Sequence, residues 1–151
     1  MVKMIDDIDP DHIGWLLFQA NQDWTLEFVD RMQAAGHGWF TGARSTLMGH
    51  IAPRGTKQGL LVDRIGISKQ AVQQLIDGLQ AEGVVERVAD PEDRRGRIVR
   101  LTEAGGAAMQ DANRIKRELE ATYRLAMGEA DFARLTELLG KLRLSRRNPV
   151  A

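Results

Sequence analysis

The 151-residue sequence predicts a mainly helical, α+β chain in which two short helices and a β-hairpin lie between long terminal helices. Three observations support this. A glycine-containing turn divides two helical segments between Thr56 and Leu79, two β-rich segments enclose a turn between Val84 and Thr102, and long segments with apolar stripes lie on either side. Helix, turn, helix and hairpin in this order indicate a winged helix-turn-helix, which presents one helix and one β-loop to duplex DNA. Gene regulation is therefore the leading hypothesis.

The turn between the two short helices is predicted at residues 64–68. Gly66 tolerates the positive φ that ends many helices, and the Ser68 hydroxyl is suited to cap the helix that follows. So short a connection forces the two helices to cross steeply, as in the DNA-binding form of the motif. The first helix is expected to bury Leu60, Leu61 and Ile65.

The second helix separates apolar from polar side chains. Its apolar residues recur at i, i+3, i+4 and i+7 and so form one stripe, which consists of Val72, Leu75, Ile76 and Leu79. The opposite face is polar and includes Asp77. The residues of this recognition helix that we expect to bind DNA are Ser68, Lys69, Gln70, Gln73 and Gln74. Glutamine can pair with adenine in the major groove, and lysine can reach guanine or phosphate. The alternative is a solvated polar face that reads no bases.

A β-hairpin, or wing, is predicted from Val84 to Ala89 and from Arg97 to Thr102, with Pro91 and Gly96 in the turn. The basic tip supplies the other predicted DNA-binding residues, Asp93, Arg94, Arg95 and Arg97. Arginine suits the enhanced negative potential of a narrow minor groove, and pairing with Asp93 is expected to hold the Arg95 guanidinium in one pose. The alternative is a salt-bridged surface hairpin without function.

Long helices are predicted at both ends. One begins at Asp9–Pro10 and ends near Gly36, and a shorter helix follows over about 41–51. Thr102 is expected to cap a helix that reaches about Gly128, with Gly105 and Gly106 weakening its first turn. A last helix opens at residues 129–131. The buried sides of these two helices are predicted to comprise Ala108, Ala112, Ile115, Leu119, Ala126, Phe132, Leu135, Leu138, Leu139 and Leu142.

At five places the sequence resembles the MarR family of bacterial transcriptional regulators, namely GISKQAV (66–72), the leucines at 75 and 79, GVVER (83–87), DPEDRR (90–95) and VRLTEAG (99–105). The resemblance is specific over about residues 56–107 and otherwise follows helix order and length. It implies that Arg95 enters the minor groove and that Asp93 braces it. The glutamine-rich recognition helix departs from common members, so their operators are not transferred to this chain.

Long helices with apolar stripes at both ends would leave too much hydrophobic surface for a monomer, which predicts a homodimer, and the resemblance implies the same. Residues 1–151 are then one MarR-like domain, with dimerisation helices over 1–36 and 103–147 and the winged helix-turn-helix over 41–102. A two-fold dimer places two recognition helices ~34 Å apart, which predicts a near-palindromic operator. The alternative is that the terminal helices bury their stripes within one subunit.

Regulators of this family usually carry a ligand pocket where the dimer helices meet the winged domain. Trp15, Phe18, Trp39 and Phe40 are candidates to line one, because ligand sites are mostly apolar and aromatic. The expected effector is then a small lipophilic or aromatic molecule that releases DNA, as for a repressor. The competing interpretation is that these aromatics are ordinary core.

Composition favours a cytoplasmic protein without cofactor, metal or membrane partner. The sequence has no Cys, its three His do not have metal-ligand spacing, and no apolar run is long enough to cross a bilayer. Nothing indicates an enzyme. Net charge is zero, but residues 1–53 carry 3 Lys/Arg and 7 Asp/Glu, whereas 54–100 carry 9 and 7. The acidic excess therefore lies away from the predicted DNA surface.

The alternative to a DNA-binding regulator is a protein-interaction or small-molecule-binding module without DNA function.

Overall fold

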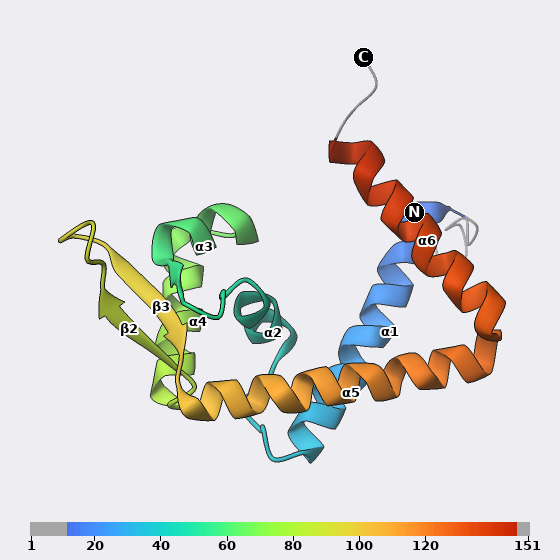
Figure 1. Cartoon of the computed structure of the whole chain (residues 1–151), viewed down its shortest axis with the longest axis horizontal. Helices are drawn as coiled ribbons and strands as arrows, with labels where there is room; N and C mark the ends of the chain where they lie inside the picture. The colour runs from blue at the N-terminus through green and yellow to red at the C-terminus, as the bar shows by residue number, and fades with distance from the viewer. Residues whose placement is uncertain (1–11, 148–151) are drawn as a thin grey trace, which may run out of the picture. The chain divides into compact units, whose positions relative to one another are not determined.

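The computed structural model describes residues 12–147 (Figure 1). Its elements are α1 (Ile13–Ala34), α2 (Gly42–Gly49), β1 (Thr56–Lys57), α3 (Gln58–Ile65), α4 (Lys69–Ala81), β2 (Val85–Ala89), β3 (Arg97–Leu101), α5 (Glu103–Met127) and α6 (Glu129–Arg147). The predicted mainly helical, α+β class is thus confirmed. One compact unit extends to Ala112 and a second begins at Asn113.

The first long helix, α1, begins after His12, whose Nδ1 accepts a hydrogen bond from the Gly14 amide at 3.1 Å. The predicted start at Asp9–Pro10 lies outside the described residues. The helix ends at Ala34, close to the predicted Gly36. Its C-terminal half is anchored, with Phe28 and Met32 buried, whereas apolar side chains of its first turns, Ile13, Leu16, Leu17 and Phe18, are exposed.

The helix-turn-helix follows the local signals of the sequence. Gly66 ends α3 at φ +73°, and the Ser68 hydroxyl caps α4 by accepting from the Ala71 amide at 3.1 Å. Leu61 is fully buried, but the prediction for Leu60 is wrong, because 43% of it is exposed. Leu60 lies in the first turn of α3, where it borders an open groove against the wing instead of the core.

The sheet has three antiparallel strands in the order β1-β3-β2. The predicted wing is its β2–β3 hairpin, paired from Val85 opposite Leu101 to Ala89 opposite Arg97. The short strand β1 was not predicted, since two residues carry no periodicity. Thr56 pairs with Val99, and its buried hydroxyl accepts from the Ala52 amide at 2.9 Å and donates to the His50 carbonyl at 3.2 Å. These bonds close the loop between α2 and the sheet.

The core of the first unit fixes the orientation of α4. Three of the four predicted stripe residues, Val72, Ile76 and Leu79, are fully buried, and Leu75 is half-buried. Because α4 packs on α2, α3 and β2 through this stripe, its polar residues Lys69, Gln70 and Gln74 are left exposed. The surrounding core consists of Phe28, Met32, Phe40, Leu47, Met48, Ile51, Leu61, Val84, Val85, Val99, Ala108 and Ala112.

The junction between wing and α5 is tightly bonded. Thr102 caps α5 as predicted, since its hydroxyl accepts from the Gly105 amide at 3.1 Å, and it also donates to the Gly83 carbonyl at 2.6 Å. Gly105 is buried against the Val84 carbonyl, where a Cβ would lie closer than 3.0 Å to that oxygen. This glycine therefore serves close packing and is not only a weak point of the helix.

The second unit consists of the rest of α5 and of α6, which are separated by Gly128 at φ +86°. Ile115 and Leu119 are buried as predicted, but Ala126, in the last turn of α5, lies beyond this stripe and is exposed. The α6 leucines predicted to be inside, Leu135, Leu138, Leu139 and Leu142, are 39–46% exposed in the single chain. None of the helices within residues 12–147 combines the length and apolarity that a bilayer span requires.

Candidate nucleic-acid interface

The outward face of α4 carries the predicted recognition residues. Lys69, Gln70 and Gln74 are exposed, and Gln73 is half-buried. The Ser68 hydroxyl accepts a hydrogen bond from the Ala71 amide and so caps the N-terminus of α4. The α4 face thus presents one ammonium and three amide side chains of the kind that can reach phosphate and base edges.

A groove of about 410 Å³ joins the recognition helix to the wing. It is lined from α3, α4 and the hairpin by Gln58, Gly59, Val62, Lys69, Gln73, Arg95, Gly96 and Arg97. The fold therefore brings together two predicted residues of the recognition helix, Lys69 and Gln73, with two of the wing, Arg95 and Arg97. Three cationic side chains around one groove favour a phosphate-rich partner.

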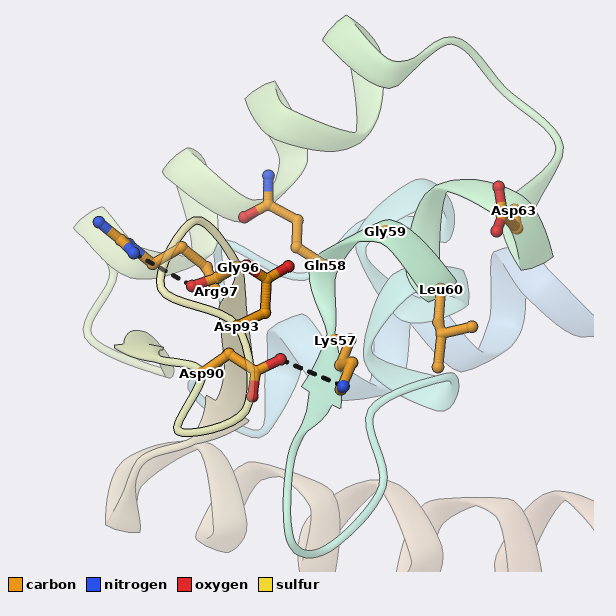
Figure 2. A pocket seen from close by; sticks show the side chains of 9 residues that line it. All are labelled: Lys57, Gln58, Gly59, Leu60, Asp63, Asp90, Asp93, Gly96 and Arg97. Carbon is orange, nitrogen blue, oxygen red and sulfur yellow. Dashed lines mark hydrogen bonds and ion pairs between the residues drawn. The ribbon is translucent and has the colours of Figure 1, made fainter.

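A second groove of about 410 Å³ lies at the base of the wing and shares Gln58, Gly59, Gly96 and Arg97 with the first. Figure 2 shows Lys57 of β1 reaching toward Asp90, where the wing loop leaves β2. The Lys57 Nζ lies 3.3 Å from Asp90 Oδ2 and 3.1 Å from Glu92 Oε2. Lys57 thus ties the first strand of the sheet to both carboxylates of the wing loop.

Asp90 is the buried member of this cluster, at 5% exposure. Its Oδ1 accepts from the Glu92 amide at 2.9 Å, and this bond, together with Lys57, holds the pKa of Asp90 below its ordinary value of 3.8. The same two carboxylates, Glu92 first, raise the pKa of Lys57 above 10.5. Asp90 and Glu92 are thus paired with Lys57, which precedes Asp90 by 33 residues and which nothing in the sequence pattern indicated as their partner.

At the wing tip, Asp93 contacts the backbone of Arg95 and not its side chain. Asp93 Oδ1 accepts from the Arg95 backbone amide at 3.0 Å, in place of the predicted ion pair with the guanidinium. The Gly96 amide donates to the Asp93 carbonyl at 2.9 Å, and Arg97 Nη1 donates to the Gly96 carbonyl at 3.1 Å. Asp93 therefore shapes the turn, while the side chains of Arg94 and Arg95 are exposed and form no ion pair with another residue in the range 12–147.

Two acidic side chains of α4 and β2, Asp77 and Glu86, are paired with arginines. Arg87 Nη1 lies 2.7 Å from Asp77 Oδ1, and Arg100 Nε lies 2.6 Å from Glu86 Oε1. The helical period predicts Asp77 on the recognition face, but no local pattern indicates Arg87 as its partner, because this contact joins α4 to β2 across the fold. These pairs reduce the repulsion that acids on this face would exert on a phosphate backbone.

The four candidate pocket aromatics form two separate pairs. Trp15 stacks on Phe18 with centroids 5.4 Å apart, and Trp39 meets Phe40 edge-on at 5.5 Å. Phe40 is only 2% exposed and packs on Phe28 at 5.2 Å. Since Phe28 follows Trp15 by 13 residues of α1, the pairs lie roughly 20 Å apart along that helix. Within one subunit the four do not line a single cavity, and Phe40 belongs to the core.

His37 makes a long-range contact that the sequence did not indicate. Its Nε2 lies 2.9 Å from Asp111 Oδ2, which connects the loop after α1 to α5. The described part of the chain contains no group of three or more His, Cys, Asp or Glu side chains placed to hold a metal ion.

Comparison with known proteins finds one matching family model and several solved structures with the same fold. Residues 40–96 match the model of the MarR family. No protein of curated function matches the sequence. A probable transcriptional regulator from Pseudomonas aeruginosa is 26% identical, with a TM-score of 0.71 over 87% of this chain and 97% of that one.

Two further proteins share the fold. Apo MarR from E. coli is 24% identical, with a TM-score of 0.75 over 90% of this chain and 98% of that one. A mutant of that protein, complexed with operator DNA, gives 22% identity and a TM-score of 0.73 over 93% and 98% of the chains. PcaV from Streptomyces coelicolor, in complex with its natural ligand, gives 18% identity and a TM-score of 0.70 over 92% and 97%.

Proposed function

We propose that this chain is a winged-helix transcriptional regulator of the MarR type, which binds a specific operator in duplex DNA and acts as a repressor. The observation that carries this proposal is the groove in which Lys69 and Gln73 of α4 meet Arg95 and Arg97 of the wing. In the proposed complex, α4 enters the major groove and the wing tip enters the adjacent minor groove. The E. coli relative solved with operator DNA supports this use of the fold.

Each part of the interface has a distinct role in this proposal. Gln70, Gln73 and Gln74 read base edges, since a glutamine amide can both donate to and accept from adenine. Lys69 and Arg94 contact phosphates and set the register without carrying sequence information. Arg95 inserts into the minor groove, where its exposed guanidinium meets the most negative potential.

A homodimer is the proposed functional unit. Support comes from apolar side chains that single-chain packing leaves exposed, namely Ile13, Leu16, Leu17 and Phe18 on α1 and Leu135, Leu138, Leu139 and Leu142 on α6. Contiguous exposed apolar side chains of this kind mark interaction surfaces. A two-fold dimer through residues 1–36 and 103–147 would present two winged cores, residues 41–102, to the two halves of a near-palindromic site.

A small aromatic or lipophilic effector is the proposed release signal. The Trp15–Phe18 stack supports this, because Phe18 is 54% exposed and offers an aromatic surface beside the proposed dimer helices. PcaV, solved with its natural ligand, supports ligand binding on this fold. A ligand that favours a dimer with misspaced recognition helices would lower DNA affinity by population shift. Calorimetry with phenolic and lipophilic compounds tests this, and absence of both heat and any change in DNA affinity contradicts it.

The deciding experiment is fluorescence anisotropy of labelled duplex from the region upstream of the gene, with a scrambled duplex of equal length, at physiological salt. We expect tight binding to the native duplex only. Arg95→Ala should weaken this binding by ~1–3 kcal/mol, as loss of one inserted arginine does. Arg143→Ala, which removes an exposed arginine of α6, is the matched control and should change little. Unchanged affinity in Arg95→Ala would remove the wing from the mechanism.

A further inference from the structure

Arg87 is bonded to both helices of the helix-turn-helix from its place on β2. Three of its contacts belong to α4, at Gln73, Asp77 and Gln80, which follow the spacing i, i+4 and i+7 and so form one line along that helix. The fourth is Gln58, in the first turn of α3. One side chain thus connects the wing with both helices.

The contacts use all three nitrogens of the guanidinium. Nη1 lies 2.7 Å from Asp77 Oδ1 and donates to Gln80 Oε1 at 2.9 Å. Nε donates to Gln58 Oε1 at 3.1 Å, and Nη2 makes a longer contact of 3.5 Å with the Gln73 carbonyl. A planar guanidinium with fixed donor directions can hold several partners in one relative arrangement, which a lysine ammonium cannot do.

We propose that Arg87 is a positioning residue that holds α3, α4 and the wing in the arrangement that DNA requires. This inference rests on the proposed function and adds a residue that does not itself touch DNA. The side chain of Arg87 is 20% exposed and its charge is paired with Asp77, so it has little left to offer a phosphate. Arg87 acts through Gln73 and its neighbours, by fixing where the base-reading amides lie.

The first test needs no DNA. Hydrogen–deuterium exchange of Arg87→Ala should be faster than wild type in α4 and β2 and unchanged in α6. Arg100→Ala is the matched control, because Arg100 also lies in the wing and pairs with an acid, Glu86, at 2.6 Å, but on the neighbouring strand. Its exchange in α4 should match wild type. Unaltered α4 exchange in Arg87→Ala would overturn the proposal.

The second test measures operator affinity against salt concentration. Arg87→Ala should bind the operator about tenfold more weakly, the effect expected on losing a charge-assisted contact. Since Arg87 touches no phosphate in this proposal, the slope of log affinity against log salt should stay at the wild-type value. A slope smaller in magnitude by about 0.9 would mean that Arg87 itself neutralises a phosphate, and would refute the positioning role. Arg87→Lys should resemble Arg87→Ala, and wild-type affinity in this variant would also refute it.

The third test asks whether Asp77→Ala raises or lowers the affinity for the operator. Removing an acid from a DNA-facing surface should tighten binding if only charge matters. Positioning predicts the opposite, so Asp77→Ala should weaken operator binding by several-fold, and the double variant with Arg87→Ala should be no weaker than Arg87→Ala alone. Tighter binding by Asp77→Ala, or additive losses, would overturn the proposal.

The three tests separate this inference from the proposed function. A wild-type protein that does not discriminate native from scrambled duplex would refute sequence-specific regulation, and the exchange experiment would still decide whether Arg87 holds α4. Conversely, specific binding that is unaffected by Arg87→Ala would refute the positioning role and leave the regulator proposal intact.

Discussion

Replacing Gly105 by alanine should destabilise the protein, although alanine is the better helix former. Gly105 lies in the first turn of α5, and a methyl group there would lie closer than 3.0 Å to the Val84 carbonyl oxygen. That oxygen also accepts from the Thr102 amide at 3.1 Å, so it belongs to the junction that joins wing and helix. Because the obstacle is backbone and not a flexible side chain, the wing and α5 must separate to admit the methyl group.

The magnitude follows from three contributions. Forcing an extra methyl group into a packed site costs ~1–3 kcal/mol. Weakening the Thr102–Val84 hydrogen bond costs about 1 kcal/mol more, and the gain in helix propensity returns up to ~1 kcal/mol. The free energy of unfolding of Gly105→Ala should therefore fall by roughly 1–3 kcal/mol.

The adjacent Gly106 provides the matched control. A Cβ at Gly106 meets no atom within 4 Å, so Gly106→Ala should raise the free energy of unfolding by ~0.5–1 kcal/mol through propensity alone. Urea unfolding of both variants and wild type, followed by circular dichroism at one protein concentration, gives the comparison. Equal or greater stability in Gly105→Ala than in Gly106→Ala would refute the packing argument.

Three other predictions concern the interface, the dimer and the wing base. Gln73→Ala should lower the ratio of the affinities for operator and scrambled duplex more than it lowers overall DNA affinity, as measured by anisotropy titration. Equal losses of affinity for both duplexes would mean that Gln73 reads no bases. If the proposed dimer forms through the leucines of α6, Leu139→Glu should dissociate it in analytical ultracentrifugation. Ala133→Glu, on the opposite face of α6, should leave it intact. Two unchanged sedimentation profiles would exclude the leucine face of α6 as the interface. The pKa of the Asp90 carboxyl, measured by ¹³C NMR titration, should lie below 3.8. Its contribution to stability is then full above pH 3.8 and is lost as pH falls through the lower folded-state pKa. A pKa at or above 3.8 would contradict the combined effect of the Glu92 amide and Lys57 on this carboxylate.

Local signals in the sequence predicted the helix-turn-helix well. The left-handed Gly66 and the Ser68 cap each depend on atoms within three residues, and the stripe that includes Val72 and Ile76 depends only on helical period. Such features need no knowledge of the tertiary fold. The predicted start of α4 and the predicted bounds of both wing strands therefore agree with the structure within one residue.

Contacts set by strand register could not be predicted in the same way. Lys57 reaches Asp90 only because β1 pairs with β3, with Thr56 opposite Val99, and two residues of strand leave no pattern in the sequence. The contacts of Arg87 likewise depend on how β2 lies against α4. The exposure of Leu60 likewise depends on the tertiary fold, because the groove that Leu60 borders forms only when the wing packs beside α3.

The pairing of acids explains how a chain with a net charge of zero can present a surface suited to DNA. Near the interface, Asp77 is paired with Arg87, and Asp90 and Glu92 are paired with Lys57, so much of the negative charge is offset at short range. Arg94 and Arg95 at the wing tip have no such partner among the described residues. At distances of a few ångströms the field depends on these local pairs and not on the total charge, because salt screens charges more than ~8–10 Å away. Specific binding at close contact, with weak attraction to DNA at long range, is the behaviour that this distribution favours.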